Sequence, residues 1–110
     1  MTRATKIKDG KPVITEKAFQ ASVIQLAKQY KWKVYFTWRS IHSPAGFPDL
    51  VFCRPPRLIF AELKSEKGEL TEPQADWYDA LCQCRDYSGN GISVCIWRPS
   101  DFPAIKKILD

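Results

Sequence analysis

The spacing of apolar residues predicts a helix near the start of the chain and a strand immediately after it. Apolar side chains recur every three or four positions from residue 19 to residue 30, which is the spacing of one helix face. Thr15 can accept a hydrogen bond from the first turn, so we expect the helix to run from about Glu16 to about Lys31. Residues 33–38 (Lys-Val-Tyr-Phe-Thr-Trp) are rich in β-branched and aromatic side chains, which is typical of a strand.

The rest of the chain alternates between apolar runs and turn-forming residues. Two prolines between Arg54 and Arg57 cannot sit in a central strand, so they mark a tight turn between two antiparallel strands. Residues 92–97 are almost all apolar, as expected for a strand buried on both faces. The further expected elements are a loop at 39–48, strands at 49–53 and 58–64, a helix at 71–86, a turn at 87–91 and a short helix at 100–109. This αβββαβ core predicts an α/β fold with a small mixed sheet flanked by helices.

Length and charge fit one small domain. The chain has 110 residues, of which 45% are hydrophobic, with four Trp, four Tyr and six Phe to fill a core. Its formal charge of +5 suits a polyanionic partner such as DNA without requiring one. Four of the first twelve residues are basic and only Asp9 opposes them. We therefore expect residues 1–13 to form a basic N-terminal tail and residues 14–110 to form a single domain.

The sequence argues against several other classes of protein. No apolar run is long enough to cross a membrane and no signal peptide opens the chain, so we expect a cytoplasmic protein that is not secreted. Cys53 and Cys95 lie in apolar runs, whereas Cys82 and Cys84 diverge around the expected second helix. This pattern indicates neither a disulfide framework nor a zinc site, and we expect no organic cofactor.

Three charged residues are placed to form a metal-dependent hydrolytic site. Asp49 opens one strand of the expected hairpin, and Glu62 and Lys64 lie two positions apart at the end of the other, on one face. Antiparallel pairing brings Asp49 beside Glu62, and adjacent carboxylates repel each other unless a cation joins them. Mg²⁺ prefers oxygen ligands and keeps several waters, so its expected ligands are Asp49, Glu62 and the backbone carbonyl of Leu63. The Lys64 ammonium would stabilise charge on an attacked phosphate.

The Glu-x-Lys pair by itself is weak evidence for such a site. With five Glu and eleven Lys in 110 residues, a chain of this composition contains by chance an average of roughly 0.5 Glu-x-Lys pairs. Alternating charge on a solvated strand face would explain the pair equally well. The flanking strands, the hairpin spacing and the preceding Gly-Phe-Pro-Asp segment favour the metal site.

These residues give the chain a resemblance to the VRR-NUC (virus-type replication-repair nuclease) domain, a branch of the PD-(D/E)xK nucleases. The resemblance covers about residues 14–98. The matching pieces are Glu16, Gly46-Phe47-Pro48-Asp49-Leu50, Ala61-Glu62-Leu63-Lys64 and Gln74. It implies a restriction-endonuclease-like fold and a DNA endonuclease that uses Mg²⁺, with Mn²⁺ as a substitute. In that family Asp49 and Glu62 would bind the metal, and Lys64 would be the catalytic lysine.

The resemblance also carries expectations about substrate and assembly. Stand-alone viral members look like homodimers that cut branched DNA such as four-way junctions, in the manner of a Holliday-junction resolvase in replication, recombination or repair. A viral protein of this kind would act in the host-cell cytoplasm. Three alternatives remain open: a restriction-type nuclease, a flap nuclease of the same fold, and a DNA-binding module without catalytic activity.

Glu16 and Gln74 each allow a structural and a functional interpretation. Glu16 can complement the helix dipole, but it shares a helix face with apolar residues and can point towards the sheet as a further catalytic residue and candidate metal ligand. Gln74 follows Thr71 at the spacing of a capping box, whereas the family resemblance places a glutamine in the active site. We favour the site role for both residues. One amide is not expected to satisfy the cap and the site in full.

Four loop residues are candidates for contacts with DNA phosphates, although such residues are usually solvated whatever the function. They are Arg39, Ser43, Arg54 and Arg57. His42 is interpreted as a surface histidine. The four tryptophans are expected in the core or at an interface rather than stacked on bases, and a surplus of large apolar residues could serve a dimer. These include Trp77, Tyr78, Leu81 and Phe102.

Overall fold

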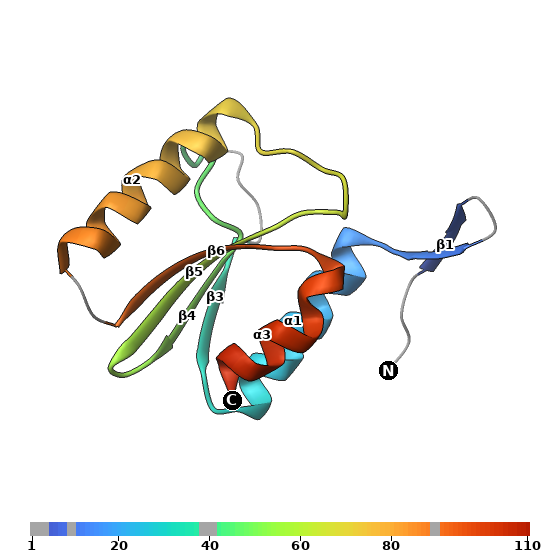
Figure 1. Ribbon diagram of the computed structural model, residues 1–110, viewed down its shortest axis with the longest axis horizontal. Coiled ribbons are helices and arrows are strands. Elements are labelled where there is room, and N and C mark those ends of the chain that lie inside the picture. Colours follow the sequence, from blue (N-terminus) through green and yellow to red (C-terminus); the bar gives the residue numbers. More distant parts are fainter. Residues whose placement is uncertain (1–4, 9–10, 38–41, 89–90) are drawn as a thin grey trace.

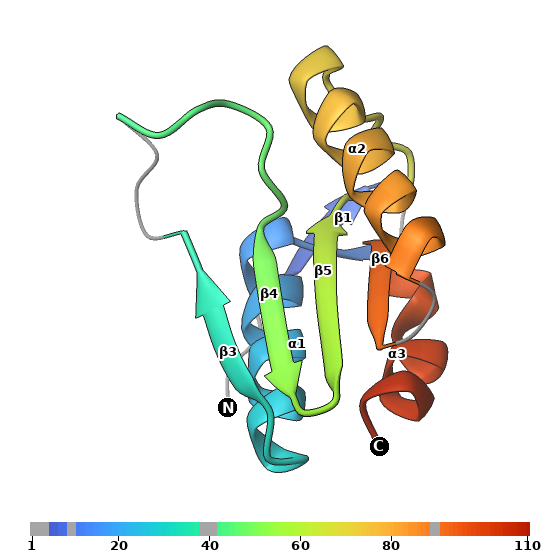
Figure 2. The same cartoon turned by 90° about the vertical axis from the view of Figure 1, so that its left-hand side faces the viewer.

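A four-stranded mixed sheet forms the centre of the molecule, with helices on both faces (Figures 1 and 2). The computed structural model describes residues 5–8, 11–37, 42–88 and 91–110. The central elements are α1 (Glu16–Gln29), β3 (Lys33–Phe36), β4 (Leu50–Arg54), β5 (Arg57–Leu63), α2 (Glu72–Ser88), β6 (Ile92–Trp97), the 3₁₀ helix η1 (Pro99–Asp101) and α3 (Phe102–Leu109). The strand order is β3-β4-β5-β6, and β6 is parallel to β5 whereas the other pairs are antiparallel. The expected α/β fold with an αβββαβ core is therefore confirmed.

The face of the sheet that meets α1 and α3 holds the core. Thr15 caps α1, because its hydroxyl accepts a hydrogen bond from the Ala18 N–H at 3.1 Å. Alternate residues of β4 and β5 point into this layer and are buried there, as the two-residue period of a strand requires. The largest fully buried side chains are Phe19, Phe52, Leu50, Ile59, Ile105, Leu109 and Val23. Leu63 joins this core, as its position between Glu62 and Lys64 predicted.

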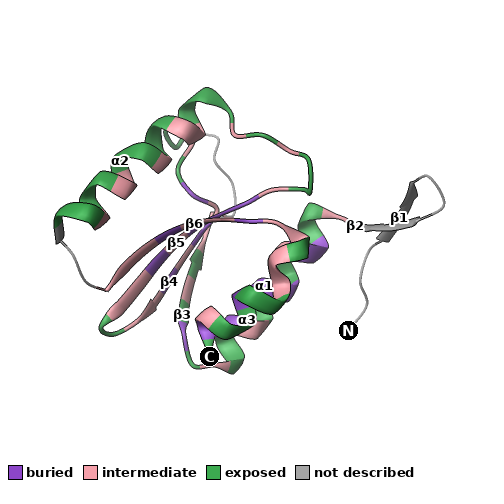
Figure 3. Ribbon diagram, viewed as in Figure 1, coloured by how far each residue is buried: buried purple, intermediate pink, exposed green. Residues whose placement is uncertain are grey.

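The opposite face is covered less completely. Helix α2 packs against β6, but none of its described side chains is buried, in contrast to α1 and α3 (Figure 3). Tyr35, on β3, leaves 61% of its surface exposed. Within β6 only Val94 and Trp97 are buried, so the prediction of a strand buried on both faces is wrong for its other residues. The reason is that an edge strand under a single helix keeps access to water.

Several element boundaries differ from the predictions by one or two residues. The expected tail contains two short antiparallel strands, β1 (Thr5–Lys8) and β2 (Lys11–Ile14), which project away from the sheet in Figure 1. No strand was predicted for these residues, because their basic side chains obscure the alternation of apolar and polar positions. The predicted turn joins β4 to β5, with Arg54 paired to Arg57. Trp38, the expected end of the first strand, lies outside the described residues. None of the described helices is long and apolar enough to cross a membrane.

Candidate active site

Asp49 and Glu62 lie together at one end of the sheet. Leu50 is paired with Ala61, so the next residue outward on each strand, Asp49 and Glu62, meet at the open end of the hairpin. The Asp49 Oδ2 atom accepts a hydrogen bond from the Leu63 N–H at 2.9 Å, which fixes the carboxylate against the end of β5. The predicted adjacency is present in the structure. The metal-binding role of the two residues stays a prediction.

Glu62 is a buried carboxyl group with one unpaired oxygen. Only 5% of the residue is exposed. Its Oε2 atom accepts a hydrogen bond from Gln74 Nε2 at 3.0 Å, whereas no donor among the described residues reaches Oε1. Burying an ionised carboxylate oxygen without a hydrogen bond costs free energy. The unpaired Oε1 atom of Glu62 therefore needs a physical explanation.

The surroundings of Glu62 favour its neutral form. Burial, and after it the negative charge of the adjacent Asp49, raise the pKa of Glu62 from 4.5 to about 8. The Lys64 ammonium acts in the opposite direction and lowers this pKa. Without a cation, Glu62 therefore keeps a proton near neutral pH. Binding a cation would remove that proton.

Lys64 is half-buried and follows the last residue of β5. Its backbone N–H donates to the Trp97 carbonyl at 2.9 Å, which continues the pairing of β5 with β6. Arg85–Asp86 is the one ion pair found in the described part of the chain, so the Lys64 ammonium does not form a salt bridge with either carboxylate. It is a positive charge beside the site that remains able to contact a phosphate.

Gln74 makes the contacts of a helix cap and at the same time contacts Glu62. Its Oε1 atom accepts a hydrogen bond from the Thr71 N–H at 2.8 Å, and its own N–H donates to the Thr71 hydroxyl at 3.3 Å, which completes a capping box. Its Nε2 atom donates to Glu62 at the same time. The two contacts are compatible because an amide has a separate donor and acceptor and Glu62 lies on the donor side. The active-site role of Gln74 stays a prediction.

Glu16 does not join the two carboxylates. It lies in the first turn of α1 and is exposed, which agrees with the helix-dipole interpretation rather than with a side chain that points towards the sheet. Within the described ranges, no group of three or more His, Cys, Asp and Glu side chains could hold a metal ion. Any metal bound at Asp49 and Glu62 would therefore take its remaining ligands from backbone, water or substrate.

The candidate DNA-binding residues are scattered. Arg54 and Arg57 lie at the opposite end of the sheet from Asp49, beside the C-terminus. The Arg54 guanidinium donates to the carbonyls of Tyr30, Leu109 and Asp110 at 2.9–3.3 Å, and both guanidinium groups stack on Trp32. These contacts give Arg54 and Arg57 a structural role, so neither arginine is counted as part of the site. The candidate Arg39 lies outside the described residues.

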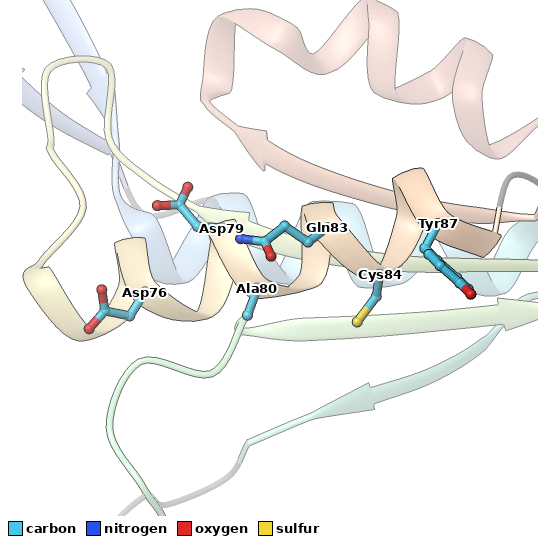
Figure 4. A pocket seen from close by; sticks show the side chains of 6 residues that line it. All are labelled: Asp76, Asp79, Ala80, Gln83, Cys84 and Tyr87. Atoms are coloured by element: carbon cyan, nitrogen blue, oxygen red, sulfur yellow. The ribbon is translucent and has the colours of Figure 1, made fainter.

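Two surface hollows flank α2. One, of about 300 Å³, lies beside the loop that leads to Asp49 and is lined by Tyr35, Thr37, Ser43, Pro44, Phe47 and Trp77. Trp77 is 36% exposed, whereas Trp32 and Trp97 are buried as expected. The other hollow, of about 620 Å³, follows the outer side of α2 (Figure 4), where Asp76 and Asp79 give it negative charge. The second hollow does not include the paired carboxylates and is a poor surface for DNA.

Arg98 holds the segment that follows Lys64, a role that was not predicted from the sequence. Its Nη1 atom donates to the carbonyls of Ser65 at 2.5 Å and Gly68 at 2.7 Å. The Glu66 carboxylate in the same turn accepts hydrogen bonds from the Ser100 N–H and hydroxyl. The segment after Lys64 is thereby attached to the end of β6. No local signal could have revealed these contacts, because they join residues thirty or more positions apart.

Comparisons with known proteins do not assign the chain to a family by sequence. No protein-family model matches it, and no curated protein matches it. Among solved structures, it is similar to the Holliday junction resolvase Hjc of the archaeal hyperthermophile Archaeoglobus fulgidus, with a TM-score of 0.48 and 18% identity. The match covers 74% of this chain and 66% of the resolvase, slightly less than two thirds of that protein. The proposed function therefore rests on the sequence pattern and the geometry of this chain.

Proposed function

We propose that the chain is a metal-dependent endonuclease that hydrolyses phosphodiester bonds in branched DNA. One observation carries the proposal: two carboxylates meet at the end of a hairpin, and one of them has a buried oxygen that no donor reaches among the described residues. A lysine on the same strand face adds the positive charge that phosphate chemistry needs. The sequence pattern makes a stand-alone VRR-NUC nuclease the specific form of this proposal, acting as a homodimer on four-way junctions.

The carboxylates suit Mg²⁺ better than other common ions. Asp49 and Glu62 present oxygen atoms, and the unpaired Glu62 Oε1 is a free ligand position. Mg²⁺ is usually bound by one or two carboxylates and completes its shell with water and substrate phosphate, so a third carboxylate is not needed. The Leu63 backbone lies against Asp49, which makes its carbonyl the candidate third protein ligand. When bound, the ion would polarise the phosphate and lower the pKa of a coordinated water.

The chain's own residues have separate tasks in this scheme. Asp49 and Glu62 would hold the ion, and Gln74 would keep the Glu62 carboxylate oriented through its Nε2 atom. Lys64 would place its ammonium near the phosphate, where it opposes the charge that builds up as a water oxygen bonds to phosphorus and an ester P–O bond breaks. Glu16 stays a candidate for the surrounding water shell only, because its side chain is exposed.

A nicking assay on three substrates tests the proposal. The purified protein is incubated with a four-way junction, a flap and a linear duplex, with Mg²⁺, with Mn²⁺ or with a chelator. We expect divalent-dependent cleavage of the junction, and loss of cleavage in Asp49→Asn and Glu62→Gln with the fold and DNA binding retained. Asp79→Asn removes an exposed carboxylate from the outer side of α2 and serves as the matched control. Cleavage by the Asp49 or Glu62 variant at the wild-type rate would remove the site.

The pattern of cleavage separates the alternatives. A preference for the flap would indicate a flap nuclease, and sequence-dependent cleavage of the duplex would indicate a restriction-type enzyme. Binding of DNA without cleavage under any metal condition would leave the binding-module interpretation. Only the junction preference supports the resolvase form of the proposal.

A further inference from the structure

Gly46 occupies a position where the backbone of the Asp49 loop touches the backbone of α2. Its φ angle is +96°, a region that residues with a side chain rarely adopt. A Cβ atom at this position would lie 2.4 Å from both the carbon and the oxygen of the Pro73 carbonyl, and 2.8 Å from the Gln74 nitrogen. Ordinary contacts of a Cβ atom begin at 3.4 Å, so a methyl group would force the two backbones apart by about 1 Å.

The backbone that Gly46 touches also carries the amide that holds Glu62. The Pro73–Gln74 peptide lies in the first turn of α2, where Gln74 makes the capping box with Thr71. From this turn the Gln74 side chain reaches Glu62 at 3.0 Å. A displacement of about 1 Å would lengthen that hydrogen bond beyond the distance at which it contributes.

We infer that Gly46 is a positioning residue of the active site. The absence of a side chain there lets the first turn of α2 rest on the loop, and this contact sets the distance between Gln74 and Glu62. The inference rests on the proposed function, because it explains how a glycine three positions before Asp49 controls the geometry of the carboxylate pair. The loop places Asp49 beside Glu62, and α2 places Gln74 beside it. Gly46 lies where the loop and α2 are in contact.

Gly91 provides a matched control. It also has a positive φ angle, +86°, and a Cβ atom there would lie 2.5 Å from the Pro56 carbonyl oxygen. The strain of Gly91→Ala is therefore of the same kind as that of Gly46→Ala. Gly91 lies beside the β4–β5 turn, at the end of the sheet opposite Asp49, because its carbonyl accepts a hydrogen bond from the Leu58 N–H.

The first measurement does not depend on activity. We compare the NMR signals of the Gln74 side-chain amide in wild type, Gly46→Ala and Gly91→Ala, without metal, and assign them with Gln74→Ala. We expect the Gln74 signals of Gly46→Ala to move towards those of a solvent-exposed glutamine and those of Gly91→Ala to stay unchanged. Unchanged Gln74 signals in Gly46→Ala would overturn the inference, and so would a Gly46→Ala protein that fails to fold while Gly91→Ala folds.

The second measurement is a double-mutant cycle on single-turnover cleavage. A misplacement of about 1 Å near reacting groups can cost about 10²-fold in rate, so we expect a loss of that order in Gly46→Ala with DNA affinity retained. If Gly46 acts through Gln74, adding Gly46→Ala to Gln74→Ala should change the rate by less than about threefold. Independent, multiplicative losses would overturn the inference. If wild type cleaves nothing, the proposed function fails, while the NMR comparison still tests the coupling between Gly46 and Gln74.

Discussion

The raised pKa of Glu62 predicts that the metal-free protein loses stability as the pH rises. A carboxyl group whose pKa is higher in the folded state stabilises the fold while it is protonated. This contribution is fully present below the unfolded pKa of 4.5 and is lost as the pH rises through about 8. Within that window the loss amounts to about 1.4 kcal/mol per pH unit. Between about pH 6 and about pH 9 it adds up to about 3 kcal/mol of the free energy of unfolding.

Glu62→Gln isolates this contribution. The amide has nearly the same shape as the carboxyl group, can accept from Gln74 Nε2 and can donate to Asp49, but it cannot ionise. Urea unfolding in a chelator at about pH 6 and about pH 9 gives the free energy of unfolding for both proteins. The pH-induced change in the free energy of unfolding of the variant is subtracted from that of wild type. This subtraction cancels the contributions of the other titrating groups. The remaining difference should be about 3 kcal/mol, lowered to the extent that the carboxylate relaxes towards water.

Mg²⁺ should reverse the trend in wild type alone. Binding requires the ionised Glu62, so the ion should restore stability at the higher pH and release a proton, which calorimetry in two buffers can count. Glu62→Gln should gain little from Mg²⁺. If wild type and Glu62→Gln respond to pH in parallel, the buried unpaired carboxylate described above does not exist in solution.

Three further predictions concern Lys64, Arg54 and the oligomeric state. Lys64→Ala should slow single-turnover cleavage by about 10²–10³-fold. Lys64→Arg should not restore the rate, because a planar guanidinium replaces a compact ammonium. Full activity of Lys64→Ala would show that the residue is only a solvated charge. Arg54→Ala should lower the free energy of unfolding by about 2 kcal/mol, measured by urea titration, because its guanidinium donates to backbone carbonyls and stacks on Trp32. These contacts lie far from the site, so the cleavage rate should stay unchanged. Light scattering at micromolar concentration should show a dimer, since two symmetric nicks require two sites. A monomer with equal activity on junction and duplex would contradict the resolvase proposal.

The sequence by itself determined the elements and the position of the carboxylate pair. The distribution of apolar residues located α1, β5 and β6 to within two residues: α1 by its helical spacing, and the two strands by their short apolar runs. The two prolines determined the turn, and a tight turn leaves one antiparallel register, so Asp49 had to meet Glu62. These features follow from local chemistry and from one short-range pairing, and both can be read from neighbouring residues.

The tertiary structure alone decided how each charged side chain is used. Arg54 and Arg98 differ little in sequence context from arginines that bind phosphate, yet both bond to backbone carbonyls, because strand ends far apart in sequence bring those carbonyls within reach. Gln74 caps α2 and holds Glu62 because Gly46 lets the helix approach the loop. The raised pKa of Glu62 arises from its burial and from the neighbouring Asp49 carboxylate. Desolvation and hydrogen-bond partners depend on which distant segments pack together, and that information is not contained in the spacing of residues along one strand.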